Sequence, residues 1–173
     1  MSYRQKLSSI TEQLELLFSI APRQNRKSQR RVSQSDPILH KQWCQIRKSF
    51  FPELTDLDSY VVAWSNRPQK RVLASCNIHR RRILVAKELN QESVSCWLEP
   101  ILYHEMCHAV IGHGVALSRS GKRQWHGAEF KALEARHPNI VALDEWIKSG
   151  GWARAVRSSR SKEAWRRRRS GDV

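Results

Sequence analysis

Residues 94–112 have the sequence VSCWLEPILYHEMCHAVIG, and this stretch decides the fold. Its apolar residues recur at helical spacing over a wide face, which predicts a largely buried helix. Pro100 lies in the first turns of this helix, where proline is tolerated, and Gly112 is typical of a helix end. We therefore expect a buried helix over residues 94–112, whose regular part begins near Pro100.

Two histidines and a glutamate interrupt this apolar helix. His104, Glu105 and His108 fit the pattern H-E-x-x-H. Residues four apart on a helix differ in direction by only about 40°, so both imidazoles can reach one metal ion. Unpaired polar side chains would be costly in so apolar a helix, which argues against chance. The pattern predicts that His104 and His108 are metal ligands and that Glu105 is a catalytic acid/base acting on water.

A catalytic zinc site has three protein ligands and one open position. Three histidines follow the motif, and His126 is the expected third ligand, because it opens a new helix after a loop that can carry it back to the first helix. His113, near the helix-ending glycines, is the lesser alternative. His137, beside a proline, is expected to be a surface or capping residue. A glutamate ligand would have to be Glu129 or Glu134.

Three neighbours of these residues have a structural and a functional interpretation. Tyr103 and Cys107 lie next to the histidines in sequence, and we expect both to pack in the core. Trp125 precedes His126, and packing is favoured there too. A role for Trp125 in shielding the metal site or in contacting substrate is the alternative.

The composition divides the chain into four parts. Residues 1–20 are predicted to form an amphipathic helix, and residues 21–36 a basic linker. The main domain is expected over residues 37–152, with Asp36 as a helix N-cap followed by proline. Residues 153–173 form an Arg-rich tail that we expect to be disordered.

The elements expected within the main domain predict an α+β fold. Alternating apolar residues over 60–64, 72–76 and 83–85 predict a small antiparallel sheet, with turns at 66–69 and 77–81. Helices are expected over 37–50, 126–138 and 141–150, in addition to the motif helix. We expect the small antiparallel sheet to pack on the motif helix.

The charge of the chain is strongly positive and unevenly placed. Lys and Arg number 31 against 16 acidic residues, for a net charge of +15. Residues 21–35 hold five basic and no acidic residues, and residues 153–173 hold eight basic and two acidic ones. Such segments attract polyanions, so DNA phosphates are the expected partner. Arg166, Arg167, Arg168 and Arg169, which follow Trp165, are the candidate contacts, with a merely solvated tail as the alternative.

The four cysteines form no C-x-x-C pair, which excludes a disulfide scaffold and a four-cysteine zinc ribbon. No secretory signal and no apolar run of membrane-spanning length is evident. We expect a cytoplasmic protein with no membrane partner. A nucleoid-associated or nuclear location is the alternative.

Two segments together resemble a known family. The sequences HEMCHA at 104–109 and WHGAEF at 125–130 resemble the SprT-like, Spartan-related zinc metallopeptidases, which show H-E-x-x-H and then H-G-x-x-F. The resemblance covers roughly residues 38–150. It implies a zincin-like domain in which Zn²⁺ is bound by His104, His108 and His126, with Glu105 catalytic. It also implies that the strand at 83–85 is the family's edge strand.

The expected function is zinc-dependent hydrolysis of peptide bonds in a protein or peptide substrate, with proteins bound to DNA as one candidate class of substrate. One alternative is a metal-dependent hydrolase of a nucleotide phosphoanhydride. The other is a non-catalytic nucleic-acid-binding module with a structural zinc. The last would need a fourth protein ligand, and none is spaced for it.

Overall fold

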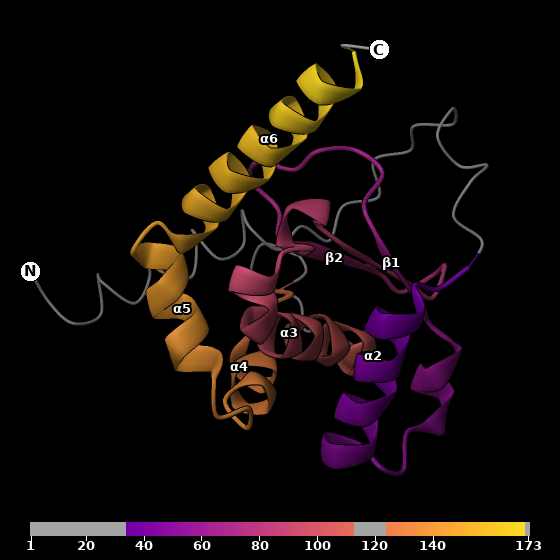
Figure 1. Ribbon diagram of the computed structural model, residues 1–173. Coiled ribbons are helices and arrows are strands. Elements are labelled where there is room, and N and C mark those ends of the chain that lie inside the picture. The colour runs from indigo at the N-terminus through magenta and orange to yellow at the C-terminus, as the bar shows by residue number, and fades with distance from the viewer. Residues whose placement is uncertain (1–33, 113–123, 172–173) are drawn as a thin grey trace, which may run out of the picture.

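The computed structural model of the chain describes residues 34–112 and 124–171. Helices α2 (Pro37–Phe50) and α3 (Leu98–Ile111) pack against a sheet of β1 (Val61–Trp64), β2 (Ala74–Asn77) and β3 (Arg82–Val85). Three helices follow, namely α4 (Ala128–Glu134), α5 (Ile140–Lys148) and α6 (Gly151–Ser170), as Figure 1 shows. Short 3₁₀ turns are η1 (Thr55–Ser59), η2 (Lys87–Leu89) and η3 (Glu92–Trp97). The α+β class is thus confirmed, while the helix predicted over 1–20 and most of the linker lie outside the described residues.

Helix α2 begins where its cap predicts. The Asp36 carboxylate accepts hydrogen bonds from the backbone N–H groups of Ile38 and Leu39, at 3.1 and 3.0 Å. These are two of the donors that a helix start leaves without partners. The buried side of α2 contains Trp43, whose indole N–H donates to the Leu57 carbonyl of η1 at 2.7 Å. The N-cap therefore sets the start of α2, and Trp43 joins α2 to η1.

The sheet is mixed, so the prediction of an antiparallel sheet is wrong for one of its strands. β2 pairs antiparallel with β3, but β1 pairs parallel with β3, and the strand order is β1-β3-β2. The segment 65–73 between β1 and β2 does not close a hairpin. Its two ends bond to the end of β3 instead, because Ser65 N–H donates to the Val85 carbonyl and Ala86 N–H donates to the Leu73 carbonyl, both at 2.7 Å. Because the segment 65–73 does not pair β1 with β2, β3 lies between them in the sheet.

The order also corrects the position of the strand at 83–85. The family resemblance implied an edge strand there, whereas β3 is central and β1 and β2 are the edges of the described sheet. The predicted turn at 77–81 does join β2 to β3. Arg81 takes the left-handed φ of 46° that such a tight turn requires, and Asn77 Oδ1 accepts from Arg80 N–H at 3.0 Å.

The motif helix is buried as expected but begins later than residue 94. Residues 92–97 form the 3₁₀ turn η3, and the α-helix begins at Leu98, two residues before Pro100. It ends before Gly112, whose positive φ of 59° is a backbone conformation that glycine adopts without a steric penalty. Tyr103 and Cys107 are fully buried, which confirms their core assignment.

The C-terminal tail is helical, so the prediction of disorder from residue 153 is wrong. α6 runs to Ser170 and extends beyond the rest of the molecule in Figure 1. Its first turns bury Trp152, Ala155 and Val156. The junction with α5 is close, because a Cβ atom on Gly151 would lie 2.2 Å from the Trp146 indole nitrogen. Apolar packing at the start thus orders a helix whose later turns are charged.

No helix in the described part of the chain has the length and apolar character needed to cross a membrane.

Candidate metal centre

The structure brings the three expected histidines to one point. His104 and His108 lie one turn apart on α3, both with only 1% of their surface exposed. His126 lies just before α4, which packs against α3. The Nε2 atom of His108 is 3.2 Å from Nε2 of His104 and 3.1 Å from Nε2 of His126. The three ligand atoms all lie within 4.8 Å of one another.

This spacing fits a single metal ion. A tetrahedral zinc with Zn–N bonds of 2.0–2.1 Å separates its nitrogen ligands by about 3.3 Å. The distances from Nε2 of His108 to Nε2 of His104 and of His126, 3.2 and 3.1 Å, are close to this value. Within the described residues, the group that could hold a metal contains these three histidines and no fourth ligand. The triad could therefore hold a metal ion and leave one coordination position open.

The environment of the rings favours neutral imidazoles, the form that offers a lone pair to a metal. Burial lowers the pKa of His104 and His108 well below the ordinary value, and the neighbouring histidines lower it further. Burial also lowers the pKa of His126, partly offset by the charge of Glu134. Burial and the neighbouring imidazoles thus keep each ring in its neutral form, with a single ring proton.

Glu134 contacts His104 at Nδ1, the ring nitrogen that does not face His108. Its Oε1 atom is 2.5 Å from Nδ1 of His104. We assign the proton to Nδ1, which donates to the carboxylate and leaves the Nε2 lone pair directed at the cluster. Burial raises the pKa of Glu134 to about 7, against the lowering effect of His126 and Lys131. Glu134 is thus a positioning residue outside the histidine group, and Glu129, the other candidate ligand, is exposed.

Sequence reasoning missed the role of Glu134, because the motif points only to direct ligands. His126, Phe130 and Glu134 follow one another at intervals of four, the spacing of one helix face. Phe130 is buried, and its ring centroid lies 5.0, 4.4 and 4.7 Å from those of His104, His108 and His126. One side of α4 therefore supplies an apolar contact to all three rings and a hydrogen bond to one.

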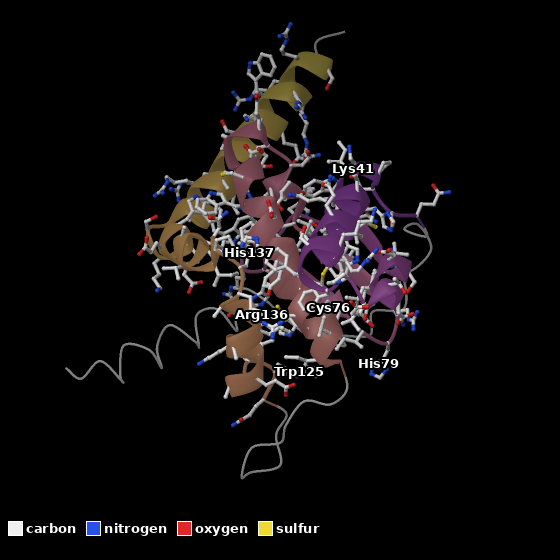
Figure 2. The ribbon with its side chains drawn as sticks, turned by 90° about the horizontal axis from the view of Figure 1, so that it is seen from below. Lys41, Cys76, His79, Trp125, Arg136 and His137 are labelled. Atoms are coloured by element: carbon white, nitrogen blue, oxygen red, sulfur yellow. The ribbon has the colours of Figure 1, made fainter. Side chains whose placement is uncertain are left out.

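Glu105 is fully buried, and neither carboxylate oxygen has a hydrogen-bond partner within the described residues. Burial raises the pKa of Glu105 well above its ordinary value. It lies near β2, since its charge adds to the burial that raises the pKa of Cys76 (labelled in Figure 2). A buried carboxyl group is costly without a partner, so this position calls for a donor such as a water or a substrate group.

His137 is not the surface residue that was expected. It is buried, its ring stacks on Phe50 at 5.4 Å, and it lies 4.9 Å from the Tyr103 ring. Its position is labelled in Figure 2. Its Nδ1 atom accepts from Asn139 N–H at the start of α5, so the local capping part of the expectation does fit. Tyr103 also has a structural contact, because its hydroxyl donates to the Leu133 carbonyl at 2.7 Å.

Trp125 is half-buried directly ahead of His126, at the position labelled in Figure 2. Its suggested role against substrate stays a prediction. His113 lies outside the described residues.

The comparison with protein families agrees with this arrangement. The sequence profile of the SprT-like family matches residues 39–143, a range that contains the whole of the histidine cluster and Glu105. The chain belongs to the SprT-like family, as its two sequence segments indicated. No curated protein and no solved structure gives a significant match.

Proposed function

We propose that this protein is a zinc-dependent metallopeptidase. The observation that carries the proposal is the convergence of three imidazole nitrogens on one point. Two of them, from His104 and His108, lie on α3, the helix that also carries the fully buried Glu105. Membership of the SprT-like family supports a metallopeptidase-type domain. The lack of a fourth ligand in the described group supports a catalytic rather than a structural site.

Three imidazole ligands suit zinc, among other divalent metals. When bound, zinc supplies a Lewis acid that polarises a carbonyl group and lowers the pKa of water. The residues of the chain do the rest. His104 and His108 hold their lone pairs inward, and the Glu134 carboxylate fixes the His104 ring. The Glu105 carboxylate takes a proton from the attacking water and delivers it to the amide nitrogen that leaves. Glutamate is one of the side chains that can accept and then release a proton in this way.

We further propose that the substrates include proteins bound to DNA. The later turns of α6 support this, because residues 164–170 are all exposed and include Arg166, Arg167, Arg168 and Arg169. Trp165 is 57% exposed, and the Arg169 guanidinium lies 4.7 Å from its ring centroid. Arginine can contact phosphates, and an exposed tryptophan can stack on an unpaired base.

Two variants test the peptidase proposal on the full chain. Zinc content is measured by mass spectrometry, and activity by cleavage of a fluorescently labelled, unfolded protein. Glu105→Gln should keep its zinc and lose about 10²–10⁴ in rate, because the proton acceptor is gone. His126→Ala should lose zinc and activity together, whereas Glu129→Gln, an exposed control on α4, should lose neither.

Wild-type cleavage rates in the Glu105→Gln variant would contradict the assignment of the base. Zinc-loaded protein that hydrolyses a nucleoside triphosphate but no protein would favour the phosphoanhydride alternative.

A further inference from the structure

A cationic groove lies between the β1–β2 connection and α6. It has a volume of about 560 Å³ and is lined by Arg67, Pro68, Gln69, Lys70, Arg71 and Arg160. We propose that this groove binds the phosphates of a nucleic-acid backbone. It is distinct from the metal centre, because none of its lining residues belongs to the histidine group. It also goes beyond the proposed peptidase activity and does not depend on it.

The backbone of the groove is held from three directions. The Trp152 indole of α6 donates to the Lys70 carbonyl at 3.0 Å. Gln69 N–H donates to Oε1 of Glu88 in η2 at 2.8 Å. The Ser65 hydroxyl donates to the Arg67 carbonyl at 2.9 Å. Because Trp152 and Glu88 are buried, the loop is anchored to the core, and its charged side chains start from a fixed base.

The charges of the groove are available to a ligand. Its lining contains four cationic side chains and no carboxylate. Elsewhere, Arg47, Arg81 and Arg167 are paired with aspartate or glutamate. Over residues 34–112 and 124–171, by contrast, the ion pairs include none of the four cations of the groove. The nearby Glu88 carboxylate is buried beneath the loop and accepts from its backbone. The groove thus concentrates positive charge that the fold itself does not neutralise.

Size and continuity favour a polymer over a single small anion. The groove is far larger than one phosphate, and it opens onto α6, the helix that contributes Arg160 and, further along, the exposed Arg166, Arg168 and Arg169. Duplex DNA presents about one negative charge per 1.7 Å of its axis, which such an extended row of cations can follow. An anionic membrane is a poorer fit, because binding to the acyl boundary needs apolar side chains, and Pro68 is the only apolar residue of the lining.

The test measures binding of the full chain to a fluorescein-labelled, mixed-sequence 20-base-pair duplex by fluorescence anisotropy at several salt concentrations. The groove variant replaces Arg67, Lys70 and Arg71 by alanine. The matched control replaces Lys41, Lys48 and Arg136 by alanine, which removes the same charge from exposed positions on α2 and beside α4; Lys41 and Arg136 are labelled in Figure 2. Zinc content and circular dichroism verify that both variants fold.

The groove variant should bind the duplex at least about tenfold more weakly than the wild type. Each phosphate that loses its cation lowers the binding constant by up to about eightfold at 0.1 M salt, and the variant removes several cations. Its plot of log K against log salt should also be flatter, by about 0.9 for each phosphate that the variant no longer neutralises. The control should stay within about threefold of the wild type, because only general attraction is reduced.

Equal binding by the groove variant and its control overturns the proposal. So does binding to phosphatidylserine vesicles without binding to DNA. An alanine variant of Arg166–Arg169 keeps the outcomes separate: loss of binding there, with none in the groove variant, would place the contact on the end of α6 instead. Protein cleavage is measured in parallel, and its absence in every variant would overturn the peptidase proposal while leaving the binding result standing.

Discussion

Glu105 and Glu134 are both inward-facing glutamates near the histidine cluster, and they differ in what they contact. Glu134 accepts a hydrogen bond from Nδ1 of His104, whereas neither oxygen of Glu105 has a partner among the described residues. The difference separates two roles. A carboxylate that accepts a hydrogen bond from a histidine holds that ring in orientation, whereas one with unmet hydrogen-bonding capacity is available to bind a water and take its proton.

The Glu134→Gln variant tests the positioning role. The amide keeps the size of the side chain but removes the negative charge of the carboxylate. That charge holds Nδ1–H of His104 and makes Nε2 of the same ring more basic. Loss of such a partner typically weakens metal binding by about 10–100-fold. Zinc affinity is measured by competition with a chromogenic chelator, and Glu129→Gln is the exposed control on the same helix. Unchanged zinc affinity in the Glu134 variant would show that the hydrogen bond does not support the site.

Sequence spacing could predict the histidines but not their surroundings. The four-residue interval of H-E-x-x-H fixes the geometry of His104 and His108 within one helix, and the later histidine motif pointed to His126. His137 was misplaced because its burial is caused by Phe50 and Tyr103, which come from two other helices. No local pattern around residue 137 contains that information.

Among the elements, α2 and η1 are joined by a bidentate ion pair. Arg47, in the last turns of α2, donates from Nε and Nη2 to the two carboxylate oxygens of Asp58, at 3.1 and 2.7 Å. Its Nη1 donates to the Pro52 carbonyl at 3.1 Å. The guanidinium of Arg47 is the main cause of the lowered pKa of Asp58. The pair therefore stabilises the fold only while Asp58 is ionised.

This pair predicts a pH-dependent effect of Asp58→Asn. Because the pKa of Asp58 is lower in the folded state, its contribution is fully present above the unfolded value of about 3.9 and is lost as the pH falls through the folded value. At pH 7 the variant should melt about 2–4 °C below the wild type, a small shift because Asp58 is partly exposed. As the pH falls below about 4 the two melting temperatures should approach each other, and they should meet once the pH is below the folded pKa of Asp58. A constant difference across the whole range would contradict the ionic origin of the effect.

The strand pattern predicted where the strands lie but not how they pair. Alternation at 60–64, 72–76 and 83–85 matches the three strands closely. Pairing depends on where the connection from 65 to 73 lies, and this is set by contacts with Val85, Glu88 and Trp152, all distant in sequence. Consecutive strands usually pair as neighbours. Here β1 and β2 do not pair, because β3 lies between them, parallel to β1 and antiparallel to β2.

For the whole molecule, α6 joins the folded body to a cationic extension. Composition predicted disorder after residue 153, because eight basic residues outweigh the few apolar ones. The apolar residues are nonetheless placed at 152, 155 and 156, the spacing of one helix face, and all three are buried. Gln91 adds a hydrogen bond to the Ala155 carbonyl and accepts one from the Ser158 hydroxyl. The boundary of the body therefore lies inside the predicted tail, near Arg160.

Two truncations locate this boundary. A chain that ends at residue 152 loses Ala155, Val156 and the hydrogen bonds that Ala155 and Ser158 make to Gln91, so its free energy of unfolding should fall by about 2–4 kcal/mol. A chain that ends at residue 161 keeps these residues and Arg160 while losing Arg166–Arg169, so its stability and zinc affinity should stay close to those of the full chain. Urea denaturation measures the stability of each. Because the chain that ends at residue 161 keeps the groove, it should also retain salt-sensitive DNA binding, at lower affinity than the full chain. Equal stability of the two truncated chains would mean that α6 is not part of the folded body.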